Sequence, residues 1–350
     1  MSGGVDSTVV ALLLKREGYD LVGVTFRTYD SIKESCLAKE KGCCTIESIM
    51  EAKHTAEKIG FEHHILDLRD TFQKCVIRNF IDEYMHGRTP NPCVLCNEHI
   101  KWGELIRFAD ELQCDYIATG HYAQIVPHQN FLYLTNATDN HKDQTYFLWR
   151  LNQQQLERTL FPLGTWTKDK VKEFATQAGF TFTAQKKESQ EICFVPQNDY
   201  RTFLRSNVPN YDQKGHFILQ DGTVVGEHLG FQNYTIGQRK GLGIALGFPA
   251  YVTHINAETN EVTLGHNEDL FRTSLIATNC SVRDWDWLAK DPTVMARIRY
   301  RSTPTEAKVE KLNETTICLH FATPVWGVTP GQSVVLYKDN LVIGGGFIEK

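Results

Sequence analysis

The chain has 350 residues, too many for one typical hydrophobic core, so we expect two or three domains. Its hydrophobic content of 41% and charged content of 23% are ordinary for a soluble globular protein, and a formal net charge of −5 gives no overall signature of nucleic-acid binding. The apolar run 9–14 is too short to cross a membrane and has no signal-peptide pattern around it, so we expect a cytoplasmic protein without a membrane partner.

Helical and strand patterns alternate through the first part of the chain. Strands are expected at 21–26, 63–68 and 116–119, and helices at 9–16, 46–59, 71–84 and 97–112. Such alternation is typical of a parallel sheet covered by helices.

Beyond residue 205 short strands between turns replace the helical pattern. Segments 251–255 and 261–264 predict a hairpin, and further strands follow from Leu275 onward, at 294–300, 307–311, 316–321, 333–338 and 341–348. This spacing is typical of a small antiparallel barrel. We therefore expect an α/β protein with a catalytic domain at 1–204, a small β-rich connector at 205–270 and a C-terminal β-barrel at 271–350.

The chain opens with Met-Ser-Gly-Gly-Val-Asp-Ser and runs directly into an apolar helix. Two glycines let the backbone approach an anion, the serine hydroxyls can donate hydrogen bonds, and the start of a helix adds unpaired N–H groups. The segment does not end in the Gly-Lys-Ser/Thr of a Walker loop and does not follow the dinucleotide pattern G-x-G-x-x-G. A pyrophosphate-binding loop is therefore favoured over a plain turn in which Asp6 caps the helix.

Cys96 follows a proline-rich loop and precedes a predicted helix that Asn97 can cap. A helix start favours the thiolate, so Cys96 is a candidate nucleophile. The alternative is half of a metal site with Cys93, although one Cys-x-x-Cys pair supplies only two ligands.

Cys193 lies in an apolar stretch beside Lys186 and Lys187, a setting in which a buried structural cysteine is the usual interpretation. Cys36, Cys43 and Cys44 are interpreted as incidental thiols of a loop, because no further ligand follows at a convincing spacing.

Five motifs occur along the chain in one order: SGGVDS, RTPNPCVLCN, ATGHY, KDQTYF and SQEICFVP. Together with GEH, TIGQRKGLG, RYR, TPGQ and GGG further on, they make the whole chain resemble the bacterial tRNA-specific 2-thiouridylases, which belong to the PP-loop ATP pyrophosphatases. The resemblance implies a PP-loop (adenine nucleotide alpha hydrolase-like) fold. It also implies ATP-dependent 2-thiolation of the wobble uridine of tRNA, through adenylation of uridine O2.

The same resemblance implies roles for individual residues. Cys193 would carry a persulfide delivered by sulfur-relay proteins, and Cys96 would be the nucleophile that forms a disulfide with it after transfer. The positions implied to bind ATP, with Mg²⁺, are Ser2, Gly3, Gly4, Val5, Asp6, Ser7, Phe26 and Gly120. The positions implied to face the target base are Asn91, Pro92 and Cys93. The positions implied to contact tRNA are His121, Lys142, Asp143, Gln144, Arg299, Tyr300 and Gln332.

The sequence departs from the family pattern at three positions. Met1 stands where relatives have the end of an apolar strand, so we expect the native chain to start upstream. Phe26 replaces a methionine that is often found there. Cys93 replaces the aspartate of many relatives, and a thiol holds no fixed charge at neutral pH. A less favoured alternative is an iron–sulfur cluster held by Cys93, Cys96 and Cys193.

Local basic clusters are the candidates for RNA contact. Arg297, Arg299 and Arg301 alternate along a predicted strand and would share one face. The cluster Lys168, Lys170 and Lys172 is interpreted as a solvated helix face.

Two other functions stay open. One is another PP-loop adenylating enzyme such as an amide-forming ligase, which would not need a persulfide carrier. The other is a catalytically impaired relative that binds tRNA or nucleotide without turnover.

Overall fold

The computed structural model describes residues 1–29, 46–186, 192–195, 197 and 199–349, and Cys36, Cys43 and Cys44 lie outside them. The chain forms two compact units. Unit 1 holds residues 1–77 and 93–200, and unit 2 holds residues 78–92 and 201–350. Within the described part of the chain, no helix is both long enough and apolar enough to cross a membrane.

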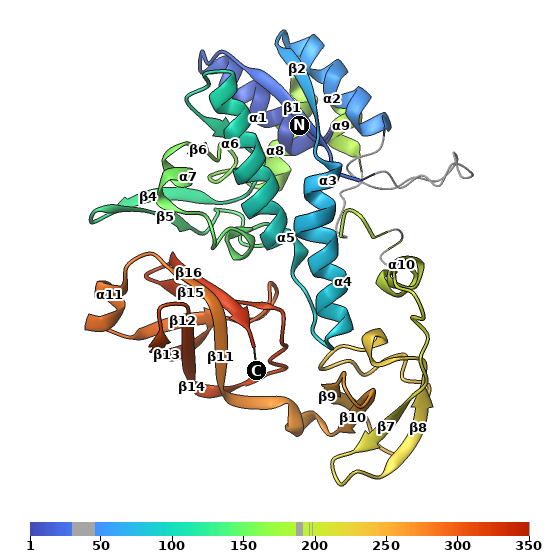
Figure 1. The fold of residues 1–350 in the computed structure, drawn as a ribbon. Coiled ribbons are helices and arrows are strands. Elements are labelled where there is room, and N and C mark those ends of the chain that lie inside the picture. The colour runs from blue at the N-terminus through green and yellow to red at the C-terminus, as the bar shows by residue number, and fades with distance from the viewer. Residues whose placement is uncertain (30–45, 187–191, 196, 198, 350) are drawn as a thin grey trace. The chain divides into compact units, whose positions relative to one another are not determined.

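Unit 1 is built on short parallel strand pairs, as the alternating pattern predicts (Figure 1). β1 (Val22–Arg27) pairs with β2 (Glu62–Asp67), and β3 (Ile117–Ala118) pairs with β6 (Thr159–Leu160). Helix α2 (Ile46–Ile59) packs on β1 and β2 and ends at Gly60, whose φ of +90° fits the predicted C-cap.

The core of unit 1 forms around α1 (Val5–Arg16) and α8 (Lys168–Gln177). Val9, Val10 and Leu14 of α1 are buried in one cluster with Val171 and Ala175 of α8. This burial fixes the helix that follows the glycine-rich loop. Elements of unit 1 that the sequence did not predict are β4 (Gln124–His128), β5 (Phe131–Thr135), η3 (Thr145–Phe147), α7 (Gln153–Glu157), β6 and α9 (Thr181–Gln185).

Two long helical runs are each interrupted by a π-helical segment. The first consists of α3 (Arg69–Phe72), η1 (Gln73–Ile77) and α4 (Arg78–Met85), and the second of α5 (Pro92–Leu95), η2 (Cys96–Glu104) and α6 (Leu105–Glu111). Both runs confirm predicted helices, but the second starts earlier than expected. Asn97 therefore lies inside the run and is not its cap. Its Nδ2 donates to the carbonyl of Phe147 at 2.9 Å.

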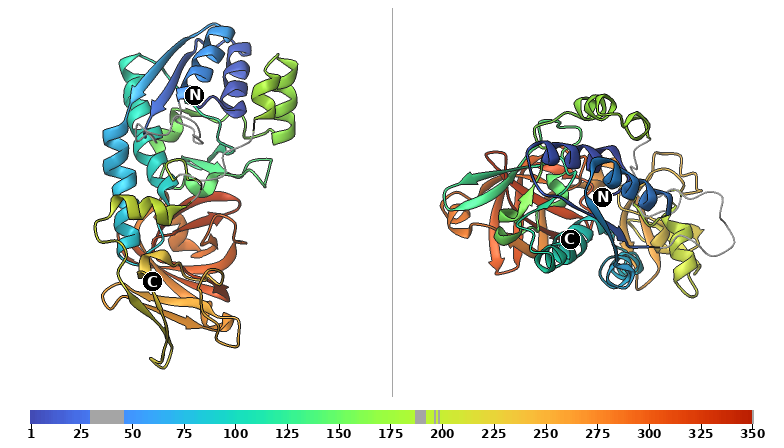
Figure 2. Two further views of the ribbon diagram at one scale, coloured as in Figure 1. Left: turned by 90° about the vertical axis from the view of Figure 1, so that its right-hand side faces the viewer. Right: turned by 90° about the horizontal axis from the view of Figure 1, so that it is seen from above.

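Unit 2 contains a small sheet with strand order β8-β7-β10-β9 (Figures 1 and 2). Its strands are β7 (Gly215–Leu219), β8 (Val224–His228), β9 (Tyr251–Asn256) and β10 (Glu261–Gly265). The pairing of β9 with β10 confirms the predicted hairpin. Phe217, Val252 and Val262 are fully buried in its core. The helical segments of this region are α10 (Tyr200–Asn207), η5 (Phe231–Asn233) and η6 (Asn267–Leu270).

The remaining strands form the expected C-terminal barrel, in the order β11-β14-β13-β12-β15-β16, closed by pairing of β16 with β11. They are β11 (Phe271–Val282), β12 (Thr293–Arg297), β13 (Thr305–Asn313), β14 (Thr316–Trp326), β15 (Ser333–Lys338) and β16 (Leu341–Ile348), with α11 (Trp285–Lys290) after β11. The predicted strand 294–300 is too long. β12 ends at Arg297, and Arg299 and Arg301 lie in the turn beyond it, so the three arginines do not share one strand face.

Barrel closure depends on the glycines 344–346, which lie opposite the end of β11. A Cβ added to Gly344 would lie 2.3 Å from the carbonyl oxygen of Ser281, and one added to Gly346 would lie 2.5 Å from Sγ of Cys280. Side chains at these positions would force the two strands apart. The run of glycines is therefore a packing requirement of the barrel.

The variant Gly344→Ala tests this requirement. We expect a loss of about 1–3 kcal/mol in the free energy of unfolding, because the new methyl group meets the Ser281 carbonyl. Urea denaturation measures the loss. Gly222→Ala is the matched control, since it adds a methyl group at a φ of +86° with no atom within 4 Å. Equal losses in the two variants would contradict the steric explanation.

Candidate functional site

The glycine-rich loop leads into α1 with no side chain capping the helix. Gly4 is the N-cap residue, and its position carries no side-chain cap hydrogen bond. Gly3 has a φ of +67°, and a Cβ there would lie 2.6 Å from the carbonyl oxygen of Ser48. The Ser7 hydroxyl donates to the Gly4 carbonyl at 3.1 Å. The first-turn N–H groups are thus left for a bound anion, as a phosphate-binding loop requires.

Asp6 anchors this loop to two distant segments of unit 1. Lys168 Nζ donates to both carboxylate oxygens, at 2.7 and 2.8 Å, and the Tyr122 hydroxyl donates to Oδ1 at 2.9 Å. Lys168 is only 7% exposed. Asp6 does not cap α1, which agrees with the favoured interpretation of the loop, whereas the interpretation of Lys168 as part of a solvated face is wrong.

Gly120 and Phe26 lie at the ends of strands β3 and β1, where ligands of parallel α/β sheets bind. A Cβ on Gly120 would lie 2.9 Å from Cβ of Asp6 and 3.4 Å from the Ser7 nitrogen. The end of β3 therefore approaches the loop so closely that only glycine fits there. Both positions are compatible with the nucleotide contacts expected of them.

The helical run that carries two of the cysteines begins at Pro92, so Cys93, not Cys96, lies in its first turn. Cys96 lies on η2, and π-helical segments inside α-helices often occur at functional sites. Desolvation raises the pKa of the Cys93 thiol although its surface is accessible, and the charge of Lys101 opposes that shift. Cys93 is therefore a neutral thiol at pH 7.

Cys193 is exposed, so the interpretation as a buried structural cysteine is wrong. The next residue, Phe194, is 2% exposed and packs edge-to-face on Phe72 of α3, with ring centroids 5.5 Å apart. Helix α3 also packs on η2, which carries Cys96. Burial of Phe194 thus places the Cys193 segment against α3, the helix that also packs on the segment carrying Cys96.

His121 is buried in a network that the sequence did not predict. Its Nε2 lies 3.2 Å from Lys101 Nζ, and its Nδ1 lies 2.8 Å from the Thr119 hydroxyl. Burial, followed by the charge of Lys101, lowers the pKa of His121 well below its usual value. The imidazole is neutral, so Nε2 accepts a hydrogen bond from Lys101 and Nδ1 donates to Thr119.

Lys101 is the residue most clearly missed by the sequence analysis. It follows Cys96 on η2, and its charge acts on both Cys93 and His121. The sequence offered one indication of its role, because Lys101 lies in the predicted helix that directly follows the candidate nucleophile Cys96. A lysine on a helix surface is so common that the spacing alone did not distinguish it.

The loop with the expected target-base residues is held by a turn of the barrel domain, within unit 2. Gln332 Nε2 donates to the carbonyls of Thr89 and Pro90, at 2.9 and 3.0 Å. The Thr89 nitrogen donates to the Pro330 carbonyl at 2.8 Å. A Cβ on Gly331 would lie 2.8 Å from the Thr89 oxygen, so this approach requires glycine. Asn91 and Pro92, at the end of the loop, are buried.

Several residues expected to contact tRNA use their polar groups inside the protein. Asp143 is 5% exposed and accepts hydrogen bonds from the Ala137 nitrogen and the Thr145 hydroxyl. Gln144 Oε1 accepts from the Tyr122 nitrogen at 3.0 Å. Arg299 donates to the carbonyls of Ile236 and Gly327, at 3.1 and 2.7 Å. Lys142 and Tyr300 are half-buried.

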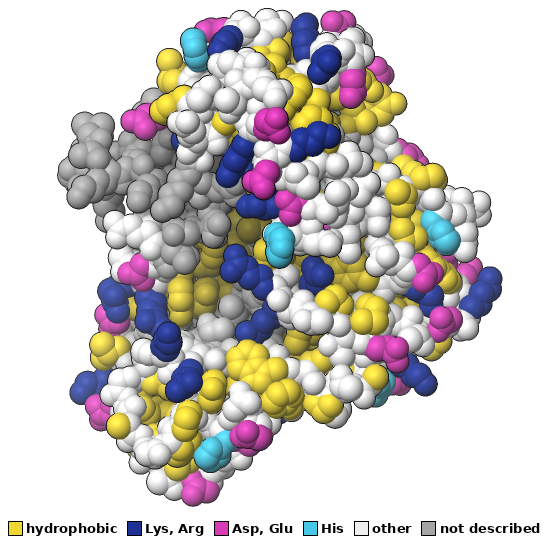
Figure 3. Space-filling model, turned by 180° about the vertical axis from the view of Figure 1, so that it is seen from behind, with side chains coloured by type: hydrophobic (Ala, Val, Ile, Leu, Met, Phe, Trp, Pro, Cys, Tyr) yellow, Lys and Arg dark blue, Asp and Glu magenta, His cyan; other side chains and the backbone are white. Residues whose placement is uncertain are grey.

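In the described part of the chain, one group of three possible ligands has all its donor atoms within 4.8 Å of one another, and it is Glu310, Cys318 and His320. Cys93, Cys96 and Cys193 do not form such a group, which concerns ligands of a single ion, so the iron–sulfur alternative stays a prediction. On the face shown in Figure 3, basic and acidic side chains are interspersed, in keeping with the modest net charge.

Comparison with known proteins identifies the family. Residues 1–197 match the model of the tRNA methyl transferase HUP domain, residues 201–266 that of the tRNA methyl transferase PRC-barrel domain, and residues 277–348 that of the aminomethyltransferase beta-barrel domain. The tRNA-specific 2-thiouridylase MnmA of Amoebophilus asiaticus is 46% identical over all of this chain and 94% of its own length.

The chain belongs to the tRNA-specific 2-thiouridylase family. A second member, from Cytophaga hutchinsonii, is 44% identical over 100% of this chain and 96% of its own length. A third, from Salinibacter ruber, is 46% identical over 100% of this chain and 93% of its own length. The expected architecture of this 2-thiouridylase relative, a HUP/PP-loop domain, a middle β domain and a C-terminal barrel, is confirmed.

The variant Lys168→Met tests the ion pair between Lys168 and Asp6, which holds the nucleotide loop of this 2-thiouridylase family member. We expect unfolding to become easier by about 1–3 kcal/mol, because the variant leaves Asp6 with an unbalanced charge. This loss in the free energy of unfolding is smaller than the loss expected for a fully buried ion pair, because the Asp6 side chain is 34% exposed. A double-mutant cycle with Asp6→Asn, followed by chemical denaturation, gives the coupling energy. Additive losses would show that the two residues do not interact.

Proposed function

We propose that this protein uses ATP to activate the wobble uridine of tRNA and replaces its O2 atom with sulfur carried by Cys193. The observation that carries the proposal is the combination, in unit 1, of an uncapped anion-binding loop with two thiols brought to the same helices. The family to which the chain belongs supports it. The products would be 2-thiouridine, AMP and pyrophosphate, and the reaction would take place in the cytoplasm.

The first step is adenylation of the base. ATP fits the loop at Ser2–Ser7, where the N–H groups of α1 face the phosphates and glycines at 3, 4 and 120 allow close approach. Uridine O2 attacks the α-phosphorus and pyrophosphate leaves. Mg²⁺ would be held by the phosphates, as is usual for this ion. The Asp6 carboxylate is already balanced by Lys168, so its role is to fix the loop.

The second step moves sulfur, and its atoms balance through the two thiols. The terminal sulfur of a Cys193 persulfide attacks C2 of the adenylated uridine, and AMP leaves. The Cys96 thiolate then attacks Sγ of Cys193, which releases 2-thiouridine and leaves a Cys96–Cys193 disulfide. Sulfur-relay proteins would deliver the persulfide sulfur, and an external dithiol would reduce the disulfide before the next cycle.

Cys93 would accept the proton of the target uridine. Asn91 and Pro92 would face the same base from the target-base loop. The neutral thiol of Cys93 differs from a carboxylate because it holds no charge near pH 7. Lys101 supplies a fixed positive charge nearby, and the neutral imidazole of His121 holds its ammonium group. We assign the electrostatic role to Lys101 and a positioning role to buried His121.

Contacts with tRNA would be shared between side chains and the loops that they support. Lys142, Gln144, Arg299, Tyr300 and Gln332 are all partly exposed. Asp143, Gln144, Arg299 and Gln332 would act by holding the backbone of their loops, because their polar groups bond within the protein. A target uridine would also have to leave its stack to reach the thiols.

Single serine variants of Cys96 and Cys193 test the assignment of the thiols. We expect each to abolish 2-thiouridine, measured by mass spectrometry of digested tRNA, and to leave tRNA-dependent pyrophosphate release in a single turnover, because adenylation precedes sulfur transfer. Cys114→Ser is the control. Thiolation at the normal rate in either variant would disprove the sulfur route. Failure of pyrophosphate release in the unaltered protein would favour a binding-only relative, and amide formation would favour a ligase.

The variant Cys93→Asp tests the proton role. Because the pKa of Cys93 lies above its usual 9.0, the thiolate fraction and the adenylation rate should rise about tenfold per pH unit between pH 6 and 8. An aspartate with an ordinary pKa is already ionised there, so the variant should show a nearly flat profile. The measurement is the single-turnover rate of pyrophosphate release. Parallel profiles would show that Cys93 does not take the proton.

A further inference from the structure

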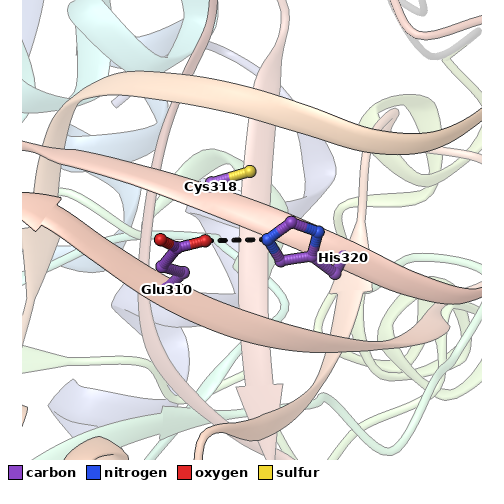
Figure 4. Close-up of side chains that lie close together, drawn as sticks. All are labelled: Glu310, Cys318 and His320. Atoms are coloured by element: carbon purple, nitrogen blue, oxygen red, sulfur yellow. Dashed lines mark hydrogen bonds and ion pairs between the residues drawn. The ribbon is translucent and has the colours of Figure 1, made fainter.

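Three potential metal ligands gather on the outer face of the barrel, and none of them has a role in the proposed thiolation. Glu310 lies on β13 directly opposite Cys318 on β14, and His320 lies two residues further along β14. Residues two apart on a strand point to the same side, so the three side chains share one face (Figure 4). Their neighbours Ile317 and Leu319 are fully buried and point into the barrel.

The three donor atoms lie close enough together to share one small cation. His320 Nε2 and Glu310 Oε2 are 2.9 Å apart, and all three donor atoms lie within 4.8 Å of one another. A tetrahedral zinc ion, with bonds of about 2.0 Å to nitrogen and oxygen and about 2.3 Å to sulfur, places its donors about 3.3–3.6 Å apart. Small rotations of the exposed Glu310 and His320 side chains reach these separations around the half-buried Cys318, and the hydrogen-bonded ladder between β13 and β14 can stay as it is.

The donor set selects the kind of ion. A thiolate and an imidazole favour Zn²⁺ over Mg²⁺ and Ca²⁺, which prefer oxygen ligands. Two other histidine–glutamate pairs, His64–Glu62 at 3.1 Å and His99–Glu98 at 3.6 Å, belong to no such group in the described part of the chain. An exposed pair of this kind contributes little by itself. The third ligand, Cys318, is what distinguishes the barrel group.

We propose that Glu310, Cys318 and His320 form a Zn²⁺ site on the outer face of the barrel, with water as the fourth ligand. Zinc bound there links β13 and β14 and stabilises the barrel. The site is separate from thiolation, since none of its ligands takes part in the proposed chemistry.

Cobalt titration of the full chain tests the site. The background variant has serine at Cys36, Cys43, Cys44, Cys93, Cys96 and Cys193, so that their thiols add no signal. We expect one Co²⁺ per chain, with a single sulfur-to-cobalt charge-transfer band and the visible bands of a four-coordinate ion, displaced by one equivalent of Zn²⁺. Cys318→Ser should abolish the charge-transfer band, and His320→Ala should weaken affinity at least tenfold.

Matched variants keep the result interpretable. His64→Ala removes a histidine from a similar pair and should leave cobalt affinity unchanged. Metal-free melting curves show whether the two barrel variants, changed on the outer face, fold as the background protein does. Zn²⁺ should raise the melting temperature of the background protein and not that of Cys318→Ser. Unchanged cobalt spectra and affinity in folded Cys318→Ser and His320→Ala would overturn the proposal.

Discussion

The bond between Asp6 and Lys168 is the interaction on which the nucleotide loop depends. Both carboxylate oxygens of Asp6 accept hydrogen bonds from the buried ammonium group of Lys168, and Oδ1 accepts another from the Tyr122 hydroxyl. The three residues come from α1, from the segment after β3 and from the start of α8. One carboxylate thus fastens the loop to the rest of unit 1, and the N–H groups of α1 are left for phosphate.

Close backbone approach is a second constraint that recurs through the molecule. Gly3 fits against Ser48, Gly120 against Asp6, Gly331 against Thr89 and Gly344 against Ser281, each where a methyl group would collide. The first two shape the nucleotide loop. Gly331 lets the turn that carries Gln332 pack against the loop before Cys93. Gly344 lets β16 pair with β11 and so close the barrel.

The cysteines show how environment separates groups of identical chemistry. Cys93 is held neutral by desolvation, while Cys193 is presented at the surface by the buried ring of Phe194. Cys96 lies on a π-helical segment together with Lys101. Cys318 lies on the barrel between a carboxylate and an imidazole, a setting suited to metal and not to sulfur transfer.

The sequence by itself determined the family, the order of domains and most elements, because motifs, hydrophobic periodicity and turn residues are local signals. It also marked the loop at Ser2–Ser7 and the thiols Cys96 and Cys193. Only the tertiary structure decided that Lys168 is buried against Asp6, that Arg299 lies beyond β12 and that Lys101 meets His121. These features depend on contacts between segments far apart in the chain, and the spacing of residues along a chain does not record which distant segments will meet.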